Sequence, residues 1–126
     1  MTLGESAEDY LESILMLQDE KHYARSVDIA AKLKVTKPSV SVAMKHLREQ
    51  GYITIDDDYL IHLTEKGEAI ASRIYDRHNT ISSYLVHLGV DAETARNDAC
   101  KMEHDISEQT YQAIKKALNE KMQQSS

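Results

Sequence analysis

The segment Cys100-Lys101-Met102-Glu103-His104 carries three kinds of metal-binding side chain. In a helix, positions i, i+3 and i+4 lie on one face, so the Cys100 thiol, the Glu103 carboxylate and the His104 imidazole converge within reach of one ion. The segment therefore offers a mixed sulfur, oxygen and nitrogen ligand set. Cys100 is the single cysteine of the chain and cannot form an internal disulfide.

Other ligand-type residues lie on two further predicted helices. Asp9 and Glu12 share a helix face by the same spacing and form a pair of carboxylates that needs a countercharge. His78 falls between Ile74 and Ile81 at helical spacing, which directs its imidazole inward. Taken together with the segment around Cys100, these residues favour a metal site more strongly than any of them does alone.

Each candidate also has a simpler structural interpretation. Ser6 stands where an N-cap is expected, and Asp9, at the third position after it, could complete a capping box. Glu12 could be a surface charge, Cys100 a small buried hydrophobe and His78 a core histidine with a hydrogen-bond partner. The metal interpretation requires the three helix faces to meet.

Three short helices followed by a two-stranded hairpin is the element order of a winged helix-turn-helix. Hydrophobic periodicity and capping residues predict the helices over 6–20, over about 26–33, and from Thr36 or Lys37 to Gly51. The strands are expected at 52–55 and 59–63, with Asp56-Asp57-Asp58 as the turn. Further helices begin at Thr64, Asp91 and Ser107. We therefore predict a mainly α protein with a winged helix-turn-helix DNA-binding domain over 1–63 and a helical domain over 64–126.

The charge pattern supports nucleic-acid binding by the third helix. The net charge of −6 argues against nonspecific coating of nucleic acid, but every charged residue from Arg25 to Arg48 except Asp28 is basic. Small hydroxyls at the start of this helix allow close approach to base edges, and its basic side chains suit phosphates. The candidate DNA-binding residues are Lys37, Pro38, Ser39, Ser41, Val42, Lys45 and Arg48. The alternative is a solvated basic face, and the triple-acid hairpin tip would be repelled by phosphate.

Several stretches match a known family: Ala7-Glu8-Asp9-Tyr10-Leu11-Glu12-Ser13-Ile14, Pro38-Ser39-Val40-Ser41, Leu63-Thr64-Glu65-Lys66-Gly67, Arg77-His78 and Asp98-Ala99-Cys100-Lys101-Met102-Glu103-His104-Asp105-Ile106-Ser107. They cover nearly the whole chain, and the last stretch is the most specific. The chain resembles the family of metal-dependent repressors that includes the diphtheria toxin repressor and the manganese transport regulator. The resemblance implies a homodimer in which the helices after the wing form a metal-binding and dimerisation domain, and in which the metal joins the first helix to the fifth.

The resemblance also implies which residues bind metal. The primary site would be Asp9, Cys100, Glu103 and His104, with Glu12 and His78 contributing to the same site or an adjacent one. Asp9 and Glu12 are similar to the manganese-type members, whereas Cys100 follows the diphtheria-type pattern. Ser82 and Arg96 stand where diphtheria-type members have ancillary-site ligands, so that second site is not expected in the same form. The SH3-like domain of longer members has no counterpart in this sequence.

The ligand chemistry narrows the choice of ion. Carboxylates and imidazole accept Mn²⁺ or Fe²⁺, whereas a thiolate shifts the preference toward Fe²⁺, Co²⁺ or Zn²⁺. We expect Fe²⁺ or Mn²⁺ as the cofactor, with Fe²⁺ slightly favoured. Zn²⁺, Co²⁺ or Ni²⁺ could bind in vitro, because selectivity depends on geometry and availability rather than on raw affinity.

These observations predict a divalent-metal-dependent transcriptional repressor that binds palindromic operators of metal-homeostasis genes as a homodimer on double-stranded DNA. The alternative is a winged-helix regulator that metal does not control. No Gly-rich phosphate loop, metalloprotease signature or oxyanion donor set points to an enzyme or to a small organic substrate. The N-terminus does not resemble a signal peptide and no apolar run could span a bilayer, so we expect a cytoplasmic protein without a membrane partner.

Overall fold

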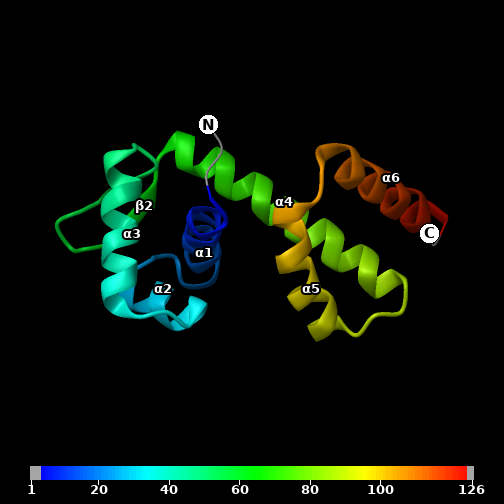
Figure 1. Cartoon of the computed structure of the whole chain (residues 1–126), viewed down its shortest axis with the longest axis horizontal. Helices are drawn as coiled ribbons and strands as arrows, with labels where there is room; N and C mark the ends of the chain where they lie inside the picture. Colours follow the sequence, from blue (N-terminus) through cyan, green and yellow to red (C-terminus); the bar gives the residue numbers. More distant parts are fainter. Residues whose placement is uncertain (1–3, 125–126) are drawn as a thin grey trace. The chain divides into compact units, whose positions relative to one another are not determined.

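A computed structural model describes residues 4–124, which form two compact units that divide within one helix, between Arg73 and Ile74. The elements are α1 (Glu5–Lys21), α2 (Ser26–Leu33), α3 (Lys37–Glu49), β1 (Ile53–Ile55), β2 (Ile61–Leu63), α4 (Glu65–His87), α5 (Ala92–Asp105) and α6 (Glu108–Gln124) (Figure 1). Each unit is described by itself below. No helix within residues 4–124 is both long and apolar enough to cross a membrane.

The first unit is a winged helix-turn-helix built on one hydrophobic core. Each of α1, α2 and α3 contacts the other two, α3 also contacts β1, and α1 also contacts β2. The core residues recur at helical spacing in the helices and alternate with exposed residues in the strands. Its most deeply buried large side chains are Leu11, Ile14, Ile29, Val40, Met44, Ile53 and Ile61. This packing fixes α3 against α1 and α2, as the sequence predicted.

The start of α3 is set by local side-chain chemistry. Thr36 is the N-cap, and its hydroxyl accepts a hydrogen bond from the Ser39 amide at 3.3 Å. Pro38 lies in the first turn, where its missing N–H is not needed. The predicted cap of α1 was wrong, because Gly4 is the N-cap and Ser6 lies inside the helix. The capping-box interpretation of Asp9 therefore fails.

The hairpin is shorter than predicted but has the expected turn. The antiparallel register pairs Ile53 with Leu63 and Ile55 with Ile61, and Tyr59 lies outside the strands with φ at 65°. Asp56 holds the turn, because its Oδ1 accepts hydrogen bonds from the amides of Asp58 at 2.8 Å and Leu60 at 3.0 Å. The first acid of the wing thus serves the fold rather than facing a partner.

A second contact of Asp56 predicts a pH effect on stability. The hydrogen bond from His62, followed by that from the Leu60 amide, holds the pKa of Asp56 below its usual 3.8. A group whose pKa is lowered by folding contributes stability above its unfolded-state pKa and loses it as the pH falls through its folded-state pKa. We expect Asp56→Ala to lower the free energy of unfolding at about pH 7, and the gap from wild type to narrow at about pH 3.

Urea unfolding of both proteins at the two pH values measures this gap. Asp57→Ala removes an exposed acid of the same turn and serves as the control. A gap that stayed constant with pH would show that Asp56 acts through turn geometry alone.

The segment that follows the wing is locked to the end of α3. Three successive carbonyl oxygens after α3 each accept a hydrogen bond from Thr64 or Lys66, at the start of α4. Lys66 Nζ donates to the Gln50 carbonyl at 3.2 Å, and Thr64 Oγ1 donates to the Gly51 carbonyl at 2.7 Å. The Thr64 amide donates to the Tyr52 carbonyl at 3.0 Å. The Lys66 ammonium also lies 4.3 Å from the centroid of the Tyr52 ring. These contacts give a structural role to the stretch Leu63-Thr64-Glu65-Lys66-Gly67, which carries part of the family resemblance.

Gly67 is required by that approach rather than by its own backbone angles. A Cβ at this position would overlap the Tyr52 carbonyl oxygen, which is backbone and cannot move aside cheaply. In an open helix site, Gly→Ala stabilises by about 1 kcal/mol. At Gly67 we expect the opposite sign, with Gly67→Ala lowering the free energy of unfolding by about 1–3 kcal/mol or more.

Chemical denaturation of Gly67→Ala measures this loss. Gly4→Ala is the control for adding a methyl group without overlap, because nothing lies within 4 Å of a Cβ at Gly4. Since Gly4 is the N-cap of α1, its replacement by alanine should cost no more than about 1 kcal/mol. Unchanged or higher stability of Gly67→Ala would contradict the proposed overlap.

The second unit consists of the rest of α4 together with α5 and α6. Asp91 caps α5 by accepting a hydrogen bond from the Thr94 amide at 3.3 Å, and the Ser107 hydroxyl accepts one from the Thr110 amide at 3.1 Å. Both residues open the helices that the sequence predicted. The domain boundary between 63 and 64 stays a prediction.

Candidate DNA-binding surface and metal ligands

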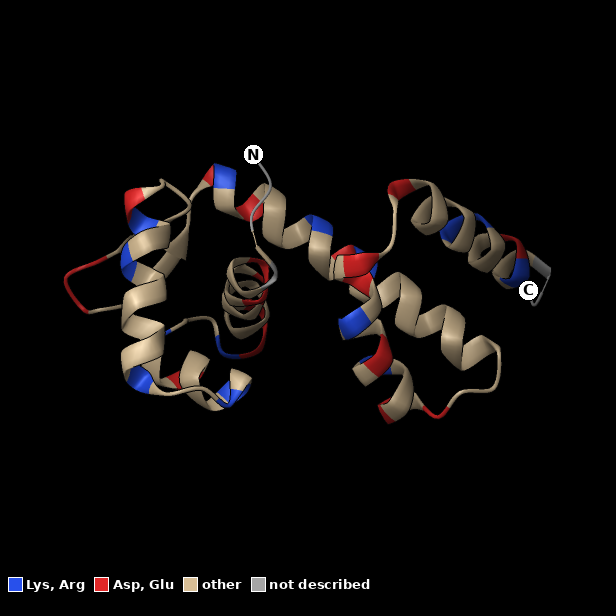
Figure 2. Ribbon diagram, in the orientation of Figure 1, with Lys and Arg blue, Asp and Glu red and all other residues tan. Residues whose placement is uncertain are grey.

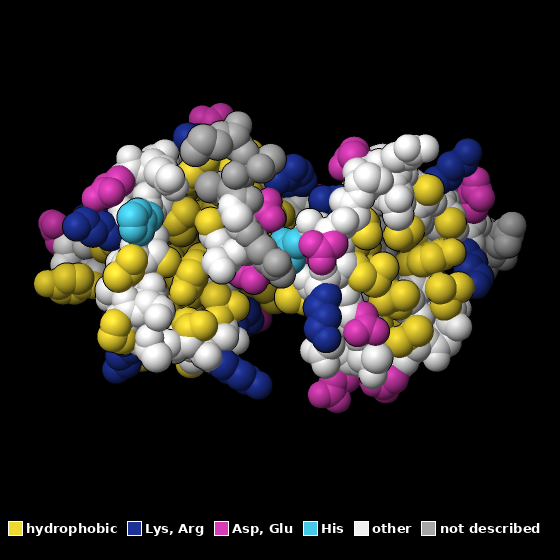
Figure 3. Space-filling view, in the orientation of Figure 1, with side chains coloured by type: hydrophobic (Ala, Val, Ile, Leu, Met, Phe, Trp, Pro, Cys, Tyr) yellow, Lys and Arg dark blue, Asp and Glu magenta, His cyan; other side chains and the backbone are white. Residues whose placement is uncertain are grey.

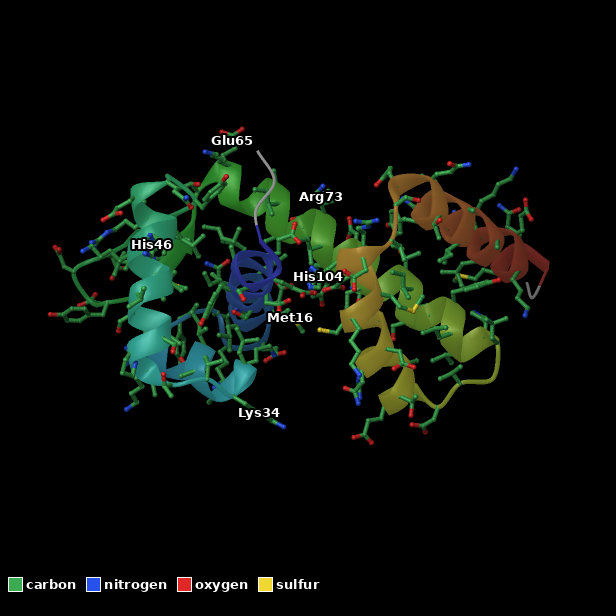
Figure 4. All side chains as sticks on the ribbon, viewed as in Figure 1. Met16, Lys34, His46, Glu65, Arg73 and His104 are labelled. Atoms are coloured by element: carbon green, nitrogen blue, oxygen red, sulfur yellow. The ribbon has the colours of Figure 1, made fainter. Side chains whose placement is uncertain are left out.

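The exposed side of α3 carries every predicted DNA-binding residue. Val40, Met44 and Leu47 are buried, so the helix turns its opposite side to solvent. The exposed residues are Lys37, Pro38, Ser39, Ser41, Val42, Lys45 and Arg48. His46, labelled on α3 in Figure 4, is also exposed, and the sequence analysis did not single it out.

In the first unit, basic residues gather on α3 and acidic residues gather on the hairpin loop. Figure 2 shows Lys and Arg at both ends of α3 and acidic residues along the hairpin loop beside it. Asp57 and Asp58 are exposed at the tip, next to Tyr59, which is 80% exposed. Phosphate would be attracted to α3 and repelled by the tip, so DNA contact is expected from α3.

The candidate metal ligands of the first unit lie on α1. Asp9 is half-buried and Glu12 is buried, although each carries an ionisable carboxylate. Carboxylates are seldom buried without a positive partner. The expectation that Glu12 is an ordinary surface charge is therefore wrong.

The candidate ligands of the second unit gather around one carboxylate. Glu103 Oε2 lies 3.2 Å from His78 Nδ1, and Glu103 Oε1 lies 3.4 Å from His104 Nε2. His78 lies on α4 and His104 lies on α5. Packing of α5 against α4 therefore brings His78 close to Glu103, although the two residues are distant in sequence. Figure 4 labels His104 on α5.

Glu103 is buried on the apolar side of α5. It continues the stripe of Ala95 and Ala99 at intervals of four residues, and only 2% of its surface is exposed. Small alanines leave room on this stripe, but they offer no donor to an ionised carboxylate. Hydrophobic periodicity along this helix predicts Ala92, Ala95, Ala99 and Met102 on one face, but Met102 is only half-buried.

The environment of Glu103 fits a cation. Among the residues that the structure describes, neither Glu103 oxygen has a hydrogen-bond partner, although two imidazole nitrogens lie close by. Ligand atoms that converge without hydrogen-bond geometry are expected where a metal completes the arrangement. A buried carboxylate with imidazoles is suited to Mn²⁺ or Fe²⁺.

Cys100 adds a sulfur ligand to this group. Its Sγ and a Glu103 oxygen lie within 4.8 Å of each other, one helical turn apart on α5. Cys100 is exposed, so its interpretation as a small buried hydrophobe is wrong. A solvent-accessible thiol can lose its proton and bind a metal more readily than one in the core.

Arg77, next to His78, ties α4 to the connection between α5 and α6. Its Nη2 donates hydrogen bonds to the carbonyls of Ile106 at 3.1 Å and Ser107 at 3.4 Å. The guanidinium also lies 5.0 Å from the centroid of the Tyr111 ring on α6. Arg77 therefore holds the end of α5 beside the helix that carries His78. Nothing in the sequence beyond the pair Arg77-His78 signals this role, because it depends on contacts with residues about 30 positions away.

Comparison with known proteins identifies the family. Residues 2–59 match the N-terminal DNA binding domain of the iron dependent repressors, and residues 64–124 match their metal binding and dimerisation domain. The transcriptional regulator MntR of Escherichia coli O6:H1 is 40% identical over 111 residues, which cover 88% of this chain and 72% of the relative. The chain belongs to the iron-dependent repressor family.

Further members of the iron-dependent repressor family agree in sequence and fold. The HTH-type transcriptional regulator MntR of Bacillus subtilis is 39% identical over 102 residues, which cover 81% of this chain and 72% of the relative. IdeR of T. acidophilum matches with a TM-score of 0.80 and 27% identity, and the manganese regulator SloR with 0.77 and 32%. Both solved structures cover 94% of this chain, which spans about half of their length (55%).

Membership of the iron-dependent repressor family confirms two predictions. The fold is a winged helix-turn-helix unit followed by a helical unit, as in the solved structures. The chain is a transcription regulator and not an enzyme.

Proposed function

We propose that this chain is a divalent-metal-dependent repressor that binds palindromic operators of metal-homeostasis genes as a homodimer. Family membership supports repression, and the convergence of His78 and His104 on the buried Glu103 supports metal control. The Glu103 environment is the single observation that carries the proposal, because a buried carboxylate needs a positive partner, and two converging imidazoles beside it form a ligand set that a divalent cation would complete.

The proposed ligands come from α1, α4 and α5. Asp9 and Glu12 belong to the unit that reads DNA, and the other four ligands belong to the second unit. The full set is Asp9, Glu12, His78, Cys100, Glu103 and His104. A bound divalent cation would supply positive charge to the three carboxylates of this set. The family resemblance implies that one metal is bound by ligands from both units. Operator affinity would then depend on whether the metal is bound.

The ion is proposed to be Fe²⁺ or Mn²⁺, with Fe²⁺ slightly favoured. The Cys100 thiolate favours Fe²⁺ over Mn²⁺, and the carboxylates and imidazoles accept both. A similar regulator, ScaR, has been solved with bound Zn²⁺ and with bound Cd²⁺, which supports binding of a divalent ion by this chain.

The homodimer is proposed to form through the second unit. Figure 3 shows hydrophobic side chains gathered on one face of this unit. The exposed large hydrophobic residues of the unit are Val86, Leu88 and Met122 among the residues that the structure describes. An exposed apolar patch of this kind suits a protein interface. Two copies of α3 would then read half-sites spaced by one or more helical turns of about 34 Å. A DNA-binding repressor of this kind is proposed to act in the cytoplasm.

The test is binding to promoter DNA of metal-uptake genes during titration with Fe²⁺ under anaerobic conditions and with Mn²⁺ in parallel. A coupling of roughly 1–3 kcal/mol between metal and DNA would raise operator affinity about 5- to 150-fold. EDTA should reverse the increase. Operator binding that EDTA leaves unchanged would support the alternative, a winged-helix regulator that metal does not control.

A further inference from the structure

Val42 occupies the centre of the exposed side of α3. A helix turns by about 100° per residue, so Val42 points almost directly away from Val40, Met44 and Leu47, which are buried. Its side chain is 58% exposed. Of the residues on α3, Val42 would therefore reach deepest into a groove that receives this helix.

The residues around Val42 are polar. Ser39 lies about one turn before it, and Lys45 and His46 lie about one turn after it, all exposed. Glu49, about two turns after Val42, is also exposed, and its carboxylate would be repelled by phosphates. This arrangement favours entry by the N-terminal half of α3, with one branched apolar side chain among hydrogen-bonding groups.

Valine at this position is not explained by helix stability. Valine is a weaker helix former than alanine, and an exposed position gains little from packing. The major groove of DNA presents one apolar group to a protein, the C5 methyl of thymine. Serine and lysine side chains read or neutralise polar groups, and they gain nothing from that methyl.

We propose that Val42 contacts a thymine methyl in each operator half-site and makes the repressor prefer thymine there. The inference rests on the proposed function, because it requires α3 to enter the major groove. Burial of the thymine methyl against Val42 should favour binding to thymine over uracil at that position by about fourfold. Uracil is the informative comparison, because it differs from thymine by the methyl alone.

The experiment begins with duplexes selected by the wild-type protein from a random-sequence pool in the presence of Mn²⁺. Each thymine of the selected duplex is then replaced, one at a time, by deoxyuridine. We expect the wild type to lose affinity about fourfold at one thymine position in each half-site. Val42→Ala should bind the thymine and deoxyuridine duplexes equally at that position, and it should fold because the site is exposed.

Val27→Ala is the matched control, because it truncates an exposed valine of the same unit outside α3. It should keep the deoxyuridine penalty. A penalty that persists in Val42→Ala, or no penalised thymine in the wild type, would overturn the assignment while leaving metal-dependent DNA binding intact. If no duplex is selected with Mn²⁺ or with Fe²⁺, the proposed function fails and the Val42 contact fails with it.

Discussion

Glu103→Gln is expected to stabilise the metal-free protein and to abolish the stabilisation that Mn²⁺ gives the wild type. Glu103 is 2% exposed and neither of its oxygens is hydrogen-bonded among the described residues, so the ionised carboxylate is poorly solvated. A neutral amide of the same shape removes that penalty. It also removes the charge on which the proposed metal site is centred, so metal affinity should fall by more than the roughly 10- to 100-fold loss typical of a residue outside the ligand set.

Thermal unfolding with EDTA and with Mn²⁺ separates the two effects. At a free metal concentration about 100 times Kd, the wild type should gain about 2.7 kcal/mol, and the variant should gain almost nothing. Both proteins are measured at the same pH, so that the change at Glu103 is the single difference between them.

Asp105→Asn is the matched control, because it neutralises an exposed acid on the same helix. It should change neither value. Full metal stabilisation of Glu103→Gln would refute the assignment of Glu103, and loss of folding would show that its charge is structural.

The helices and the wing could be predicted where local chemistry determines them. Thr36, Asp91 and Ser107 accept hydrogen bonds from amides only a few residues later, so their effect is visible in sequence. The same reasoning failed at Ser6, because α1 begins after the N-cap Gly4, which has no side chain to form a hydrogen bond and leaves no signal of this kind. Tyr59 shortened the second strand through its positive φ, which aromatic residues rarely adopt.

The candidate site could be predicted only in part, because its geometry depends on contacts between distant residues. Spacing placed Glu103 and His104 together on one helix and directed His78 inward, and the resemblance assigned all three to one metal site or to adjacent sites. His78 lies 3.2 Å from Glu103 because α4 packs against α5. The hydrogen bond from Arg77 to Ile106 forms because α4 also packs against the C-terminal end of α5. Periodicity within a helix carries no information about such contacts.

Replacing Lys45 and Arg48 together by alanine is expected to weaken operator binding by at least about 100-fold at low salt, and to weaken nonspecific binding to a similar extent. Both side chains lie on the exposed side of α3, which buries its apolar stripe, so they can meet phosphates without disturbing the core. Neutralising a phosphate releases counterions from the DNA. The slope of log K against log salt should therefore fall by about 0.9 for each phosphate that the variant no longer neutralises, or by about 3.6 for two phosphates in each of two subunits.

Lys115→Ala with Lys116→Ala is the control, since this pair removes the same charge from exposed positions on α6, outside the DNA-reading unit. Binding isotherms for all three proteins at several salt concentrations, with metal held constant, distinguish a local interaction from a global field. The α3 variant should show a smaller slope and the α6 variant should keep the wild-type slope, because counterions are released where phosphate is touched. An equal change in both would mean that net charge governs affinity, and the assignment of α3 as the DNA-reading helix would then lose its electrostatic support.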